Sequence, residues 1–153
     1  MKKSTPFVFI LIYLASFVFS LLAPKRPFWY AWLNKPSLTP SSKTIGIIWG
    51  ILYVFIALAV SIIYNQHGFR KGKPFYLLFI INFFVNQAFG HVFFKAKSTS
   101  LAAVDTILVS LTAIFLNFLA RSLSLASAVL LLPYSLWSSF ATYLAVKIYW
   151  LNR

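Results

Sequence analysis

The chain has 153 residues, of which 61% are hydrophobic and 10% are charged, and it carries a net charge of +13. Soluble domains have about a quarter charged residues, so this composition excludes a water-soluble globule and makes a lipid bilayer the expected solvent. The sequence contains no cysteine, which excludes disulfides, thiolate metal sites and thiol catalysis.

The positive charge comes from 14 Lys and Arg residues set against a single acid, Asp105. In a soluble protein such an excess would suggest nucleic-acid binding. Here the basic residues lie mostly beside and between apolar runs, where they can meet anionic lipid head groups. We therefore expect the bilayer as a partner and expect no nucleic-acid partner.

Apolar segments long enough to cross a bilayer, which takes roughly 20 helical residues, recur along the chain. Each must be helical, because lipid offers no partners for unpaired backbone groups. The first could instead be a signal peptide headed by Lys2 and Lys3, but its end lacks small residues at both cleavage positions, so we expect an uncleaved helix. The expected spans are residues 7–23, 45–66, 75–94, 101–119 and 125–151. This pattern predicts an all-α integral membrane protein, with a five-transmembrane-helix bundle as one domain over residues 1–153.

The long first connection, residues 24–44, should form a structured lid. Pro27 suits the first position of a short helix, where its missing N–H costs nothing, and Pro36 should end that helix near Lys35. Ser41 or Ser42 is the expected N-cap of the second span. On this short helix we expect one shared face, made by Phe28, Trp29, Trp32 and Leu33.

The remaining connections are short, which makes successive spans antiparallel neighbours. Five crossings then place the lid beside the start of the second span, the end of the third, the start of the fourth and the end of the fifth. The basic residues divide six against eight between the two sides, so the positive-inside rule does not determine orientation. The unusual polar and aromatic residues of the spans lie in the lid half: Trp49, Tyr53, Asn82, Asn86, Gln87, His91, Asp105, Trp137 and Tyr143. We expect a polar and aromatic cavity there.

Each of these residues also has a purely structural interpretation. Asn82 and Asn86 could hydrogen-bond a neighbouring helix, and Asp105 could pair with Lys95 or Lys97 near the head groups. An acid inside a span is nevertheless a functional candidate by default. The two histidines form no metal-ligand cluster, so no metal is expected, and no Ser-His-Asp or paired-carboxylate arrangement supports hydrolysis.

The sequence carries a series of motifs: Trp29-Tyr30, Leu33, Lys35-Pro36-Ser37, Pro40, Trp49, Tyr53, Asn82, Asn86-Gln87-Ala88-Phe89, Val104-Asp105, Pro133-Tyr134, Leu136-Trp137, Phe140-Ala141 and Tyr143-Leu144. In these motifs the chain resembles the translocator protein family, also known as tryptophan-rich sensory proteins (TspO/MBR) or peripheral-type benzodiazepine receptors. The similarity covers essentially the whole chain and includes the size, the five spans and the long first loop. It departs at Pro40-Ser41, where many relatives have two prolines, and at Leu38, where many bacterial members have tryptophan.

The resemblance implies a receptor-like homodimer in a membrane, here expected to be a bacterial plasma membrane, with a pocket under the first loop. Family members bind porphyrins and haem as ligands, and some bind sterols or benzodiazepine-type compounds; no cofactor is required. The pocket residues that it implies are Tyr30, Pro40, Ile45, Trp49, Asn82, Asn86, Phe89, Asp105, Trp137 and Ala141.

Two alternative functions remain open. Some bacterial members resemble catalysts of light- and oxygen-dependent porphyrin breakdown, which would make Trp49, Trp137 and Tyr30 the catalytic residues. The family's name also implies a tetrapyrrole transporter. Against transport, the spans show no inverted repeat and no pair of Gly/Pro-broken helices.

Overall fold

The structure is a computed structural model that describes residues 2–153. Over these residues every regular element is a helix, and five helical segments are long and apolar enough to cross a membrane, with α4 and η1 counted as one. The elements in chain order are α1 (Thr5–Leu22), α2 (Pro27–Trp32), α3 (Ser42–Lys71), α4 (Lys73–Gly90), the π-helical η1 (His91–Lys95), α5 (Thr99–Leu123) and α6 (Leu125–Leu151). The predicted all-α, five-span fold is confirmed.

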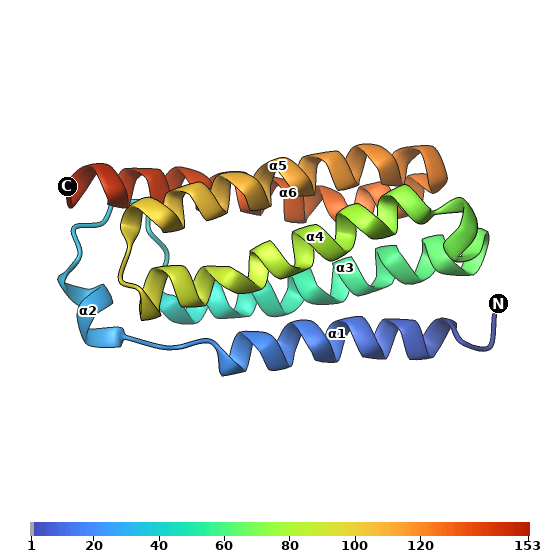
Figure 1. The fold of residues 1–153 in the computed structure, drawn as a ribbon, viewed down its shortest axis with the longest axis horizontal. Helices are drawn as coiled ribbons and strands as arrows, with labels where there is room; N and C mark the ends of the chain where they lie inside the picture. Colours follow the sequence, from blue (N-terminus) through green and yellow to red (C-terminus); the bar gives the residue numbers. More distant parts are fainter. Residues whose placement is uncertain (1) are drawn as a thin grey trace.

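The long helices run side by side as one bundle (Figure 1). Helix α5 packs against α4 and α6, while α3 packs against α1 and α6. The N-terminus lies at one end of the bundle, and the C-terminus lies with α2 at the other (Figure 1). The first loop therefore covers the end of the bundle opposite the N-terminus, as the order of the five crossings predicts.

Serine side chains cap the starts of three spans. Ser41 accepts a hydrogen bond from the backbone N of Thr44 at 3.1 Å, so the predicted cap of the second span is confirmed. Ser98 caps α5 and Ser124 caps α6 in the same way. Each hydroxyl pairs one of the backbone N–H groups that a helix start leaves free.

Two spans extend beyond their expected ends. Helix α3 continues past residue 66 to Lys71, with a break at Gly68, whose φ of 63° is a left-handed value that glycine adopts without strain. Helix α5 ends at Leu123 rather than near residue 119. The apolar stretch gives only the minimum length of a membrane-spanning helix. The helix can continue through polar residues such as Arg121, whose long side chain reaches the membrane surface.

The short helix α2 begins at Pro27 as predicted but ends at Trp32 rather than near Lys35. The predicted shared face is also wrong. Phe28 and Trp32, one turn apart, point outward with 83% and 87% of their surface exposed, whereas Trp29 packs inward. A helix this short presents its i and i+4 positions on one side, so Phe28 and Trp32 separate from Trp29 and Leu33.

Small residues allow the spans to pack closely. Ser127 is fully buried and donates from Oγ to the carbonyl of Ala59 on α3 at 2.9 Å. Gly90 lies where the end of α1 passes the end of α4, and a Cβ at this position would stand 2.6 Å from the Cβ of Ala23. Small residues at helix contacts are typical of membrane bundles, and here Gly90 holds the end of α1 next to the lid half.

Candidate functional site

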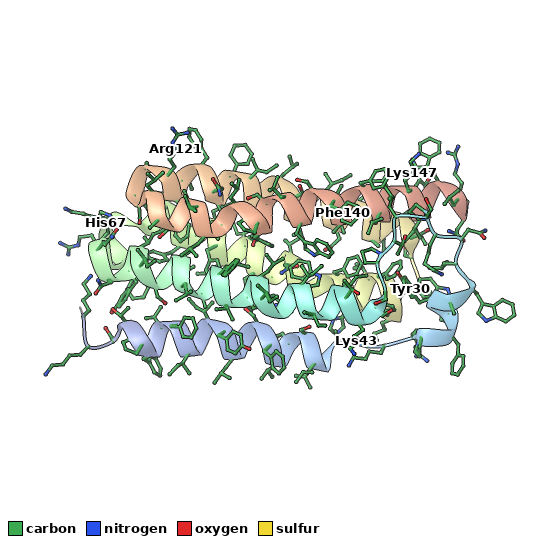
Figure 2. All side chains as sticks on the ribbon, turned by 180° about the vertical axis from the view of Figure 1, so that it is seen from behind. Tyr30, Lys43, His67, Arg121, Phe140 and Lys147 are labelled. Carbon is green, nitrogen blue, oxygen red and sulfur yellow. The ribbon has the colours of Figure 1, made fainter. Side chains whose placement is uncertain are left out.

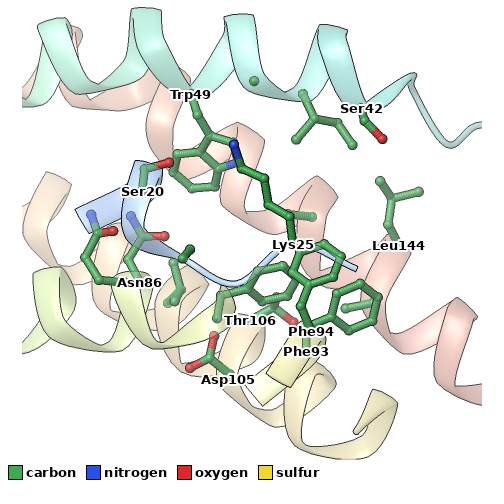
Figure 3. Close-up of a pocket in the computed structure, with 18 of the residues that line it drawn as sticks. Ser20, Lys25, Ser42, Trp49, Asn86, Phe93, Phe94, Asp105, Thr106 and Leu144 are labelled. Carbon is green, nitrogen blue, oxygen red and sulfur yellow. The ribbon is translucent and has the colours of Figure 1, made fainter. Parts of the chain in front are cut away.

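A cavity of about 500 Å³ lies in the half of the bundle that α2 covers. Side chains from α3, from α4 and η1, and from α5 and α6 form its walls, while the end of α1 and the linker to α2 close it on another side. Figure 3 shows Trp49 projecting from α3 on one side and Asp105 on the other. The expected cavity is therefore present, at the expected end of the bundle.

Aromatic rings from several helices contribute to the walls. Trp49 lies against Tyr53 and Tyr134, with ring centroids 5.7 and 6.1 Å apart. Trp137 lies on α6 with its ring 5.6 Å from that of Phe140. Two indoles thus line one apolar space, as suits a site for a flat, largely apolar molecule.

The π-helical segment η1 contributes two adjacent aromatic residues to the same cavity. Phe93 and Phe94 both line it, although an α-helix would turn successive side chains about 100° apart. A π-helical turn often marks a functional site. The sequence interpretation missed both residues, because no periodicity signals a π-helical turn.

The roof rests on these phenylalanines. Trp29 meets Phe93 at 5.1 Å and Tyr30 meets it at 5.9 Å, both edge to face. Burial raises the pKa of the Tyr30 phenol above its ordinary value, so the group remains a hydrogen-bond donor at neutral pH. Tyr30 lines the cavity, whereas Trp29 packs the roof and Trp32 faces outward.

Lys35 fastens the roof from its other side. Its Nζ donates to the carbonyls of Tyr30 and Leu33, both at 2.8 Å, and lies 4.8 Å from the Tyr30 ring. A cation at this position donates hydrogen bonds to carbonyls at the end of the helix. It also interacts favourably with the helix dipole, whose negative end lies there. Lys35 therefore caps the end of α2 from outside the helix, rather than lying within it as Pro36 alone predicted.

A pair of asparagines joins the lid to the last span. The backbone N of Asn34 donates to Asn152 Oδ1 at 2.9 Å, and Asn152 Nδ2 donates to the carbonyl of Asn34 at 2.8 Å. Asn152 also donates to the carbonyl of Ile148 on α6, at 2.7 Å. We call Asn34 and Asn152 the lid clasp, because together they tie the loop to the end of α6.

Two buried polar groups in the cavity wall lack partners. Asp105 is 8% exposed and lines the cavity, and its Oδ2 has no hydrogen-bond partner among residues 2–153. The indole Nε1 of Trp137 is likewise buried without a partner. Unpaired buried polar atoms are costly, so this wall is less completely hydrogen-bonded than the rest of the bundle.

All but two of the predicted pocket residues line the cavity. The structure brings together Tyr30, Ile45, Trp49, Asn86, Phe89, Asp105, Trp137 and Ala141.

Pro40 is absent from this lining, which the neighbouring Thr39 and Ser42 reach instead. Asn82 is also absent, because it is 3% exposed and its side chain is committed to helix contacts. Its Oδ1 accepts from the Tyr134 hydroxyl at 2.8 Å, and its Nδ2 donates to Thr112 Oγ1 at 2.7 Å.

The cavity lining also includes two basic residues of the first loop. Lys25 and Arg26, in the linker between α1 and α2, line one side of it. In the sequence they stand between Pro24 and Pro27, where a basic loop residue can meet either lipid head groups or the acidic groups of a ligand. No cluster of three His, Cys, Asp or Glu side chains able to hold a metal occurs within residues 2–153.

Comparison with known proteins agrees with this architecture. Residues 7–151 match the TspO/MBR family. The chain is 49% identical to "Tryptophan-rich protein TspO" of Bacillus cereus over 99% of both proteins, and 41% identical to "Uncharacterized membrane protein YtaB" of Bacillus subtilis over 95% of this chain and 94% of that protein. It is 33% identical to the human "Translocator protein" over 74% of this chain and 69% of that protein. The chain therefore belongs to the TspO/MBR family of multi-pass membrane proteins.

Proposed function

We propose that this protein is a membrane receptor for a flat tetrapyrrole, protoporphyrin IX or haem, which it binds in the cavity beneath α2. The observation that carries the proposal is the pair of indoles, Trp49 and Trp137, lining one space of about 500 Å³. Aromatic faces stack on a macrocycle, and such contacts add to the free energy of burying apolar area.

Polar groups of the wall complement this apolar surface. Asn86 and Gln87 line the cavity from α4, and the unpaired Nε1 of Trp137 can donate to a ligand acceptor. Small-molecule sites are usually lined by many apolar groups and a few polar ones. In the homodimer that we propose, each protomer would hold one ligand in its own cavity.

Titration of protoporphyrin IX into the purified protein tests the proposal. We expect saturable binding of one ligand per chain, followed by the porphyrin absorbance, and an affinity about tenfold lower when Trp49→Phe and Trp137→Phe are combined, since each lost indole contact contributes about 0.5–1.5 kcal/mol. The matched control combines Trp32→Phe with Trp150→Phe, two exposed tryptophans outside the lining. Equal affinity in both double variants contradicts the assignment of the cavity.

A second candidate is light- and oxygen-dependent breakdown of the bound porphyrin, with Trp49, Trp137 and Tyr30 as reacting residues. It is favoured by the position of all three in the lining, next to any bound macrocycle. Illumination in air should then convert bound porphyrin to a defined product faster than in protein-free micelles, and the Trp49→Phe, Trp137→Phe variant should lose this excess. Decay at the rate of empty micelles excludes this candidate.

A further inference from the structure

We propose that Lys25 and Arg26 bind the acidic groups of the ligand, so that the cavity selects flat apolar molecules that carry carboxylates along one edge. This inference rests on the proposed tetrapyrrole binding and specifies the chemical class of ligand more narrowly. It also fixes how the ligand is oriented in the cavity.

Both residues stand at the edge of the cavity, which we call the rim. They belong to the linker that connects α1 to α2, and both line the cavity while remaining exposed. Neither side chain donates a hydrogen bond within residues 2–153. Figure 3 shows the Lys25 side chain extending across the view with its amino group on the Trp49 side.

Other basic residues near the lid have different positions. Lys35 is held by carbonyls of the lid, and the Arg153 guanidinium lies 3.6 Å from the centre of the Trp150 ring. Figure 2 shows Lys43 and Lys147 at the same end of the bundle, and neither lines the cavity. Within the described chain, Lys25 and Arg26 are the basic residues that line it.

The charges around the cavity are separated by depth. Asp105, the sole acid of the chain, is buried in the wall formed by α5, whereas the two cations stand at the rim. A ligand carboxylate beside Asp105 would meet another acid in an apolar setting, which is unfavourable. At the rim the same carboxylate meets a guanidinium, which can bind it through two hydrogen bonds, and an ammonium.

The same cavity supplies the apolar surface, since Trp49, Trp137 and Phe93 line it together with Lys25 and Arg26. A macrocycle stacked on these rings would turn its acidic edge toward the two cations. A porphyrin with two propionates has two anions for two cations. A porphyrin without the two carboxylates would still stack on the aromatic rings but would lose the contacts with Lys25 and Arg26.

The experiment compares protoporphyrin IX with its dimethyl ester, in micelles of an uncharged detergent. The proteins are the unmodified chain, the double variant Lys25→Gln with Arg26→Gln, and a control double variant, Lys43→Gln with Lys95→Gln. The control removes the same charge from exposed residues near the lid that do not line the cavity.

We expect the unmodified chain and the control to bind the diacid roughly tenfold or more tightly than the ester, because hydrogen bonds to charged groups exceed neutral ones. In the Lys25/Arg26 variant the affinity for the diacid should fall to that of the ester, while the affinity for the ester is unchanged. The retained ester binding then shows that the cavity is intact.

Three results overturn the inference. If the unmodified chain binds the diacid and the ester with equal affinity, the carboxylates contribute nothing to binding and the cations do not bind them. An equal loss of diacid affinity in the control shows that net charge, rather than the rim, is responsible. A Lys25/Arg26 variant that loses both ligands equally shows that the two residues support the fold. Absence of binding of either ligand to any protein contradicts the tetrapyrrole proposal itself.

Discussion

Asn82 and Asn86 stand one helical turn apart on α4 and serve different parts of the molecule. Asn82 is buried and joins α4 to α5 and α6 through Thr112 and Tyr134. Asn86 lines the cavity. Because Tyr134 also lies against Trp49, with ring centroids 6.1 Å apart, the hydrogen bond at Asn82 helps to hold one wall of the cavity in place.

This division predicts different effects for the same substitution. Asn82→Ala should lower the free energy of unfolding by about 1 kcal/mol, because it leaves the Tyr134 hydroxyl and Thr112 without their amide partner. Asn86→Ala should leave that free energy nearly unchanged and weaken porphyrin binding instead. Thermal unfolding in detergent and porphyrin titration of both variants measure the two effects. The reverse assignment of effects contradicts the separation of roles.

At the scale of elements, the lid clasp is the contact that can set how long a ligand stays. Asn152 reaches across to the backbone of Asn34 with two hydrogen bonds and anchors itself on α6. Lids that close over ligands often govern release. Removing the clasp should free the loop without altering any residue that lines the cavity.

We therefore expect Asn152→Ala to speed porphyrin dissociation by roughly tenfold, since it removes hydrogen bonds that each contribute about 0.5–1.5 kcal/mol. Stopped-flow displacement measures the rate. The matched control is Asn117→Ala, which removes an asparagine on α5 whose Nδ2 donates to the carbonyl of Ala128 at 2.7 Å, outside the lining. It should lower stability and leave the dissociation rate unchanged. A similar rate for both variants rules out the clasp as the controlling contact.

The elements also show how far local sequence determines this structure. Span number, the start of α2 at Pro27 and the cap at Ser41 were predictable, because hydropathy, proline chemistry and capping act within a few residues. The end of α2 at Trp32 was not predicted, and there Lys35 reaches back to carbonyls of the lid in a side-chain contact that proline chemistry does not describe. The π-helical η1 depends on packing beneath the roof, which no local pattern encodes.

The candidate site was predictable to a similar degree. Because five antiparallel crossings fix which span ends share a side, the sequence predicted that the polar and aromatic ends lie together. Most of the residues implied by the family resemblance line the cavity. Asn82 differs from Asn86 through its partners on neighbouring helices, so the sequence spacing could not separate them. The position of Lys25 and Arg26 depends on the path of the linker, which begins where Ala23 lies close to Gly90, a contact between residues far apart in the sequence.

At the scale of the whole molecule, the two halves of the bundle are built differently. In the half away from α2, large side chains such as Phe75, Ile63 and Leu116 are fully buried. In the half under α2, space is left open and Asp105 and Trp137 retain unpaired polar atoms. Sites that bind ligands commonly depart from complete packing and pairing. The closed half supplies the stability that allows the other half to stay open.

The position of Lys25 and Arg26 directly after α1 has a consequence for how ligand reaches the protein. The end of a membrane span lies near the boundary between hydrocarbon and head groups. An amphiphile dissolved in the bilayer already keeps its apolar body in the hydrocarbon and its acids at that boundary. Such a molecule, if it is the ligand, would approach the cavity by diffusion in two dimensions. Partitioning would raise its concentration, and its acidic edge would already lie at the depth of Lys25 and Arg26. The affinity apparent in water would then vary with the amount of lipid present, and the bilayer would act as the reservoir.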